Sequence, residues 1–234
     1  MLAAKEDSRT RLGCCVIEHT EAVEDYLKTI FALSTRGGPV TTSVVAGELG
    51  VAPPTVSAML KRFETHDLVR RSEDHQIALT AHGTRHALGV VRRHRLVEVF
   101  LVEVLGVPWD EVHAEAEVLE HAISARLEER IDAFLGHPTR DPHGDPIPPR
   151  SGQHVEDWAS PLADAPPGSR FRVERVSDRD DALLRHLAEL GVRPGAVLGV
   201  AEWAPFGGPL WVEIDGRKQP LGSGLVQAVH GRTI

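Results

Sequence analysis

Apolar and polar positions follow a helical period through the first part of the chain and then a strand period. The spacing predicts helices over residues 20–34, 42–49 and 54–66, with Thr20 as the N-cap of the first. Residues 68–80 alternate like two short strands around a polar turn. A helix, a turn, a second helix and a β-hairpin together indicate a winged helix-turn-helix.

The remainder of the chain reads as helices followed by a separate, mostly β segment. A long helix is expected over residues 81–105, and two further helices over 107–123 and 124–136. Residues 137–168 are dense in proline and polar residues, which is typical of a linker. Beyond it the pattern predicts a small β domain with strands over 169–176, 195–204, 210–215 and 225–231, and a helix over 180–191.

The composition is that of a globular protein. The chain has 234 residues, of which 41% are hydrophobic, enough for a sizeable core. No apolar run approaches the roughly 18 residues of a membrane span. Residues 1–19 lack the apolar centre of a secretory signal, so a flexible leader is expected there. Its two cysteines, Cys14 and Cys15, are adjacent, and neighbouring cysteines rarely form a disulfide with each other. Because no disulfide framework is expected, a reducing, cytoplasmic environment is expected.

Charge is distributed unevenly. The formal net charge of −8 argues against a protein that coats nucleic acid, yet seven arginines lie between residues 62 and 95. Winged helices serve either as protein-interaction modules or as DNA readers, and these arginines favour DNA. A recognition helix uses its first turns for base edges and phosphates. The expected DNA-contacting residues are Thr41, Pro54, Thr55, Ser57, Lys61, Arg62, Arg70 and Arg71.

The stretch HAEAEVLEH, residues 113–121, concentrates metal-ligand side chains. On a helix that turns by about 100° per residue, four of these side chains fall on one face: His113, Glu117, Glu120 and His121. In the preceding predicted helix, His94 and Glu98 stand four residues apart and also share a face. The alternative is a solvated acidic helix face with histidines by chance. Because apolar stripes adjoin both faces, the carboxylates need partners, and a divalent cation is one.

With these pieces in order, the chain resembles the diphtheria toxin repressor family of metal-dependent transcription regulators. The resemblance is carried by RRHRLVEVFLVEVLGVPWDEVHAEAEVLEHAIS, residues 92–124, and by DPHGDPIP, residues 141–148. It implies a mainly α fold with β structure, in three domains. These are a winged helix-turn-helix over 20–83 after the leader, a helical metal-binding and dimerisation domain over 84–140, and, after a proline-rich linker over 141–168, an SH3-like (FeoA-like) small β-barrel over 169–234.

The resemblance also implies two metal sites. Asp25, Glu117, Glu120 and His121 match the primary, activating site, and His94, Glu98 and His113 match the ancillary site. Iron-responsive members have methionine at the position of Asp25 and cysteine at that of Glu117. Oxygen donors at both positions resemble the manganese-responsive (MntR-type) branch and suit the hard Mn²⁺ ion.

Some positions depart from the family pattern. Lys28 stands where some manganese regulators have a glutamate, and lysine cannot bind a cation. The ancillary site of iron-responsive relatives takes ligands from the SH3-like domain at positions that align roughly with Arg175 and Asp178. Since arginine is no ligand, Asp178 is the candidate, ahead of Asp180. Ala52 and Ala58 replace a serine and a glutamine in the recognition region, which indicates a different operator.

The function expected from this reading is a homodimeric, non-enzymatic repressor of manganese homeostasis genes. Mn²⁺, with Fe²⁺, Co²⁺ or Zn²⁺ as substitutes, would tie the DNA-binding domain to the dimerisation domain, and the partners would be double-stranded operator DNA and a second copy, with no membrane. Three alternatives remain: an iron-responsive repressor of the same fold, a metallohydrolase, for which the HExxH signature is missing, and a metal buffer that does not bind DNA.

Overall fold

The computed structural model describes residues 20–151 and 159–234. The expected leader with Cys14 and Cys15, and part of the expected linker, lie outside the described residues. The chain divides into two compact units, which are described separately. Of the described residues, the first comprises 20–94, Val118–Gly136 and 148–151, and the second comprises Arg95–Glu117, His137–Ile147 and 159–234.

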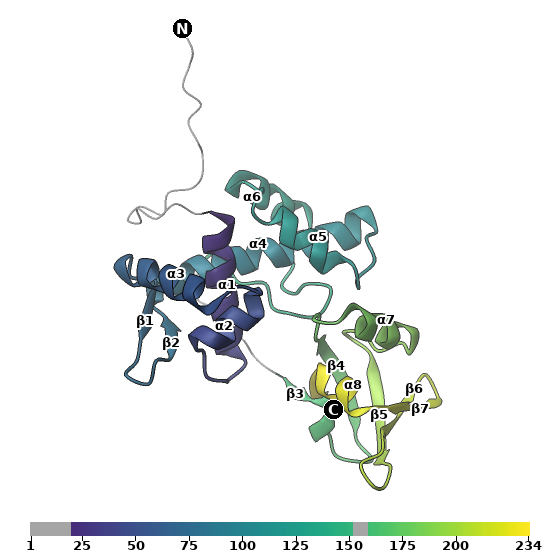
Figure 1. The fold of residues 1–234 in the computed structure, drawn as a ribbon. Helices are drawn as coiled ribbons and strands as arrows, with labels where there is room; N and C mark the ends of the chain where they lie inside the picture. Colours follow the sequence, from purple (N-terminus) through teal and green to yellow (C-terminus); the bar gives the residue numbers. More distant parts are fainter. Residues whose placement is uncertain (1–19, 152–158) are drawn as a thin grey trace. The chain divides into compact units, whose positions relative to one another are not determined.

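The first unit contains the winged helix-turn-helix that the pattern predicts (Figure 1). The hydroxyl of Thr20 accepts a hydrogen bond from the Val23 amide, which confirms the predicted N-cap. Gly50 ends the second helix in a left-handed conformation with φ of 65°. The elements are α1 (Glu21–Thr35), α2 (Thr42–Leu49), α3 (Pro53–Thr65), β1 (Val69–Arg71) and β2 (Ile77–Leu79), with the two strands paired antiparallel.

A single apolar core holds these elements together. Tyr26 of α1 meets Phe63 of α3 edge to face, with ring centroids 6.2 Å apart. Val23, Leu27 and Ile30 recur on one face of α1 and are fully buried. Helix α1 therefore forms one packed body with α2, α3 and the β-hairpin, so a contact that restrains α1 also restrains these elements.

Three further helices follow: α4 (Ala81–Leu105), α5 (Val112–Leu119) and α6 (Ala125–Phe134). The long helix agrees with its prediction. The helix predicted over 107–123 is shorter, because α5 stops at Leu119 and the Ala122 amide turns back to the Leu119 carbonyl at 3.0 Å. Glu120 and His121 therefore lie on a turn, which corrects the expectation that they share a helix face with His113.

Among residues 20–151 and 159–234, no single helix is long and apolar enough to cross a membrane, and only the pair α2 and α3, bent by 112°, passes by combined length and composition.

The second unit contains a six-stranded antiparallel sheet in the order β3-β8-β4-β5-β6-β7 (Figure 1). Its core is built from alternating buried positions such as Phe171, Val173, Leu198, Val200 and Val212. The elements are β3 (Ser160–Pro161), the short 3₁₀ turn η1 (Leu162–Asp164), β4 (Arg170–Val176), α7 (Asp181–Glu189), β5 (Val197–Trp203), β6 (Leu210–Ile214), β7 (Arg217–Leu221), α8 (Ser223–Ala228) and β8 (Val229–Thr233).

Three details of this sheet differ from the sequence prediction. Strand β3 (Ser160–Pro161) lies within the segment predicted as linker. Residues 225–228, predicted as the start of a strand, belong to the short helix α8, and the strand β8 begins at Val229. Strand β7 was not predicted, because three of its five residues are polar, a fourth is Pro220, and the strand lies at the edge of the sheet.

The loop over residues 137–147, predicted as linker, is held against the rest of the second unit. Asp141, His143 and Asp145 are all buried. At Gly144, where φ is 94°, an added Cβ would overlap the carbonyl oxygen of Glu174 on β4. The close approach requires glycine, and it seats the loop on the sheet.

Candidate metal centre and DNA-binding surface

The first unit brings together one side chain of α1 and two from the turn after α5. The Nε2 atom of His121 lies 2.9 Å from Oδ1 of Asp25 and 3.5 Å from Oε1 of Glu120. One ligand atom from each of the three residues lies within 4.8 Å of the others. Two carboxylates and an imidazole at this separation form a donor set that a divalent cation fits.

The ring of His121 is oriented from its other side. Its Nδ1 atom lies 2.8 Å from Oε2 of Glu24, whose second oxygen accepts a hydrogen bond from Arg93 at 2.8 Å. When a cation binds, a carboxylate at Nδ1 holds the proton on that nitrogen, so that the lone pair of Nε2 can coordinate the ion beside Asp25. Glu24 is thus a positioning residue that sequence reasoning missed, although it stands next to Asp25 on α1.

Glu120 is fully buried and has two partners on its own unit. Lys28 donates to Oε1 at 2.7 Å, and Nδ1 of His94 lies 2.5 Å from Oε2. Burial on its own would raise the pKa of Glu120, but the hydrogen bonds and charges of His94 and Lys28 outweigh it and lower this pKa. The carboxylate is therefore ionised and ready to bind a cation, with Lys28 as its present counter-ion.

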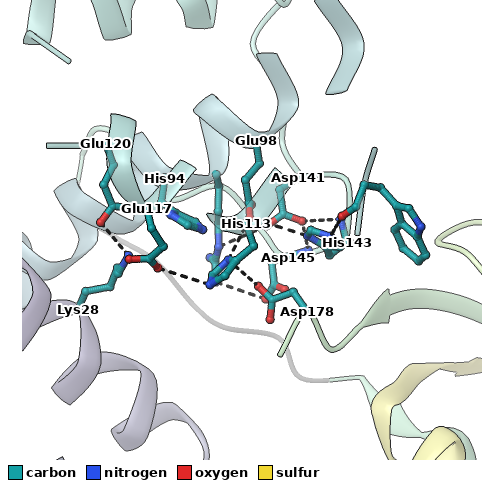
Figure 2. A network of polar contacts seen from close by, with 12 residues as sticks. Lys28, His94, Glu98, His113, Glu117, Glu120, Asp141, His143, Asp145 and Asp178 are labelled. Atoms are coloured by element: carbon teal, nitrogen blue, oxygen red, sulfur yellow. Dashed lines mark hydrogen bonds and ion pairs between the residues drawn. The ribbon is translucent and has the colours of Figure 1, made fainter. Parts of the chain in front are cut away.

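The second unit holds another group of donors, centred on His113 of α5 (Figure 2). Its Nδ1 atom lies 3.3 Å from Oε1 of Glu98 and 3.6 Å from Oδ2 of Asp178, and its Nε2 atom lies 3.4 Å from Oε1 of Glu117. Glu98, His113 and Asp178 place their ligand atoms within 4.8 Å of one another. Of the predicted ancillary residues, Glu98, His113 and Asp178 thus meet in this unit.

The other residues considered near this group have separate roles. Oδ1 of Asp180 caps α7 by accepting from the Ala182 and Leu183 amides at 2.9 and 3.1 Å. Arg175 pairs with Asp145 at 2.8 Å. Asp180 serves as this cap, whereas Asp178 approaches His113, so Asp178 is the better placed of the two aspartates.

The surface expected to contact DNA is largely exposed. On α3 and the hairpin, Pro54, Thr55, Ser57, Lys61, Arg62, Arg70 and Arg71 are all exposed, in keeping with a reading face. Thr41 is half-buried, and its hydroxyl accepts from the Val44 amide as the N-cap of α2. Arg71 forms an ion pair with Glu64 at 3.0 Å. Most of the set therefore points to solvent, whereas Thr41 has a structural role of its own.

Comparison with known families matches three successive segments of the chain. Residues 18–76 match the iron dependent repressor N-terminal DNA binding domain, residues 80–149 the iron dependent repressor metal binding and dimerisation domain, and residues 160–232 the FeoA domain. A winged helix followed by a metal-binding helical domain and a small sheet domain defines a metal-dependent transcriptional repressor rather than an enzyme.

The relatives agree with this class. The iron-dependent repressor IdeR of Mycobacterium tuberculosis is 37% identical over 205 residues, covering 82% of this chain and 88% of its own length. A manganese-dependent transcriptional repressor in complex with manganese superposes with a TM-score of 0.83 at 42% identity, over 91% of this chain and 100% of its own. ScaR with bound Cd²⁺ gives a TM-score of 0.79 at 32% identity, over 91% of this chain and 99% of its own. The chain belongs to the diphtheria toxin repressor (DtxR/IdeR) family of metal-dependent transcriptional repressors.

Proposed function

We propose that this protein is a Mn²⁺-activated, homodimeric repressor that binds operator DNA in the cytoplasm and controls manganese homeostasis genes. The observation that carries the proposal is the approach of Asp25 to His121 and Glu120. Asp25 belongs to the helix on which the winged-helix core is built. The other two residues belong to the segment that matches the metal-binding and dimerisation domain.

An ion held by these residues would act as a clamp. Because α1 is packed into the core of the DNA-binding module, fixing Asp25 restrains that whole module. Without metal, only a fraction of the head positions would suit an operator, and metal would favour that fraction through its higher affinity for it. Two recognition helices would then be held near half-site spacing, about 34 Å or a multiple.

The proposed primary ligands are Asp25, Glu117, Glu120 and His121. Glu117 of α5 is included for two reasons: it stands three residues before Glu120, and it matches a primary-site position in the family resemblance. When bound, the cation would supply charge neutralisation and a directed link between the two segments. Lys28, which now neutralises Glu120, would have to yield part of that contact to the ion.

Manganese is favoured over iron by the donor set. Asp25 and Glu117 offer carboxylate oxygens, which hard cations prefer, and the set contains no sulfur. The structural neighbour named for manganese dependence supports the same choice. An Fe²⁺-responsive repressor is the second candidate, because the IdeR proteins of Mycobacterium, 36–37% identical to this chain, are iron-dependent repressors.

The remaining residues of the proposal keep their sequence-based assignments. His94, Glu98, His113 and Asp178 are the proposed ancillary ligands, supported in the second unit by the approach of Glu98, His113 and Asp178. Thr55, Ser57, Lys61 and Arg62 on α3, with Arg70 and Arg71 on the hairpin, are the proposed DNA contacts, supported by their exposure.

The test is operator binding under different metals. DNA from upstream of the protein's own gene and of a manganese transporter gene would be titrated with protein, while anisotropy is recorded with Mn²⁺, anaerobic Fe²⁺, Zn²⁺ or chelator. The proposal expects specific binding with Mn²⁺ at concentrations where chelated protein does not bind. Activation by Fe²⁺ but not by Mn²⁺ would establish the second candidate, and binding that ignores metal would reject both.

A further inference from the structure

We propose a further divalent-cation site in the second unit, formed by Glu98, Asp141 and His143 and separate from the primary and ancillary ligand sets except for the shared Glu98. It is built by α4, which carries Glu98, and by the buried loop over residues 137–147. One ligand atom from each of the three residues lies within 4.8 Å of the others. Glu98 and His143 are fully buried and Asp141 is 8% exposed, so the donors face one another inside the protein.

His143 gives the independent indication of a ligand. Its Nε2 atom lies 2.7 Å from the carbonyl oxygen of Trp109, which can only accept, so Nε2 carries the proton. In the neutral ring Nδ1 is then a bare lone pair. This buried Nδ1 makes no hydrogen bond to any described residue, and it lies 3.9 Å from Oε1 of Glu98.

That arrangement is unfavourable without something between the two atoms. A lone pair and a carboxylate oxygen repel each other, and 3.9 Å is too long for a hydrogen bond if Nδ1 were protonated. Two ligands bonded to one cation at about 2.1 Å each can stand up to about 4.2 Å apart, so the observed separation suits a shared ion. The stacking of His143 on Trp109, with ring centroids 5.5 Å apart, holds the ring in this orientation.

The surrounding charges set the expected strength of the site. Oδ1 of Asp141 accepts from the His143 and Asp145 amides at 2.9 Å each, and Oδ2 lies 3.6 Å from the Arg95 guanidinium. Asp145 is neutralised by Arg175 and Arg95. Because these two arginines repel a cation, we expect weaker binding here than at the primary site, so that this ion binds last.

Glu98 would make the site a neighbour of the ancillary one. Its Oε1 atom lies 3.3 Å from His113 and 3.9 Å from His143, so its carboxylate stands between the two groups (Figure 2). With both filled, Glu98 would bridge two cations. The loop carrying Asp141 and His143 would then be fastened to α4, while the His143 carbonyl already accepts from the Val176 amide at 2.8 Å on β4.

The test uses the full chain stripped of metal and then titrated with Mn²⁺ alone. The inference rests on the proposed function for the choice of Mn²⁺ and, where the coupled signal is used, for occupancy of the ancillary site. Bound ions per chain would be counted by equilibrium dialysis, and the paramagnetic resonance spectrum would report coupling between bridged Mn²⁺ ions. We expect His143→Phe to lose a single equivalent of Mn²⁺ and the coupled signal.

Two further variants make the outcome decisive. Asp141→Asn preserves the backbone hydrogen bonds of the loop and should show the same loss, even if His143→Phe misfolds. Asp145→Asn, which removes a neighbouring carboxylate outside the proposed set, should keep the equivalent. Unchanged ion counts in both His143→Phe and Asp141→Asn would overturn the site. Asp25→Ala should lose a different equivalent and retain the coupling, so failure of the proposed primary site can be told from failure of this one.

Discussion

Nε2 of His121 lies 2.9 Å from Oδ1 of Asp25, across 96 residues of sequence. The contact joins the first helix to the turn after α5, with Glu24 holding the opposite side of the imidazole ring. The two side chains thus offer a nitrogen and an oxygen close together as ligands for one ion. Preorganisation of this kind reduces the entropy lost when the ligand binds.

Replacing Asp25 tests the clamp directly. Asp25→Ala should raise the Mn²⁺ concentration needed for operator binding by at least about tenfold, since one of the proposed ligands is removed. The side chain is 38% exposed, so the melting temperature without metal should change little. Anisotropy titrations and thermal melts measure the two effects. Glu21→Ala, which removes an exposed carboxylate from the same helix, should behave as wild type, and unimpaired Mn²⁺ activation of Asp25→Ala would refute the assignment.

The choice between hard and softer metals depends on Glu117. Glu117→Cys should shift activation towards Fe²⁺ or Co²⁺, because a thiolate binds these ions better than a carboxylate does. Operator binding measured across Mn²⁺, anaerobic Fe²⁺ and Co²⁺ would show the change in order. Glu115→Cys places the same thiol at an exposed position of α5 and serves as the control. An unchanged metal profile in Glu117→Cys would argue against selection by donor hardness.

Lys28 should oppose metal binding while it supports the metal-free protein. In Lys28→Met, the ammonium that competes for Glu120 is removed, so Mn²⁺ affinity should rise by about tenfold. The free energy of unfolding without metal should fall by about 2 kcal/mol, because a buried carboxylate loses a charged partner. Calorimetry and denaturant titrations test both. Lys218→Met removes an exposed lysine as control, and a variant with weaker Mn²⁺ binding would contradict the competition.

Metal affinity should depend on pH through the imidazole ligands. A histidine must be neutral to coordinate, and free imidazole side chains protonate near pH 6.5. Mn²⁺ affinity should therefore weaken as the pH falls from about 7.5 to about 5.5. Isothermal titrations in buffers of different ionisation enthalpy would also register the protons released. A flat affinity over this range would count against histidine coordination.

The second unit should lose stability in mild acid because of His230. Burial lowers the pKa of His230, and the charge of Arg175 lowers it further against an opposing backbone hydrogen bond at Ala228. The unfolded chain then binds the proton more readily, so the free energy of unfolding falls as pH drops below about 6.5 towards the lower folded pKa. Melts of metal-free protein should show this slope. His230→Gln should reduce it, whereas His186→Gln, which changes an exposed histidine, should leave it intact.

Local sequence signals account for the elements that were predicted correctly. Thr20 as N-cap, Gly50 as C-cap and the apolar face of α1 act through neighbours a few residues away, so the amino-acid pattern alone was enough to place the winged helix. The start of α8 has a short apolar run with no clear helical period, and such a run predicts a strand. Strand β7 is defined by its pairing with β6, and the mostly polar sequence of β7 does not predict a strand.

The candidate site divides in the same way. His113 and Glu117 were found from helical spacing, and Asp25 only from the family resemblance. Glu24 at Nδ1 of His121 depends on a contact between residues 97 positions apart, which no local pattern encodes. The sequence of the loop DPHGDPIP predicts a linker, because proline and charged residues are typical of solvent-exposed segments. Its burial arises from the Trp109 carbonyl and from Arg95 and Arg175, all distant in sequence.

Gly144 constrains how this protein can change over generations. Any side chain there would push the loop off Glu174, and the displacement would carry Asp141 and His143 away from Glu98. A residue that donates nothing to a cation would thereby spoil coordination as surely as loss of a donor. Substitutions that move β4 and substitutions that alter the metal ligands of the loop are therefore coupled, because both act through the close contact between Gly144 and Glu174.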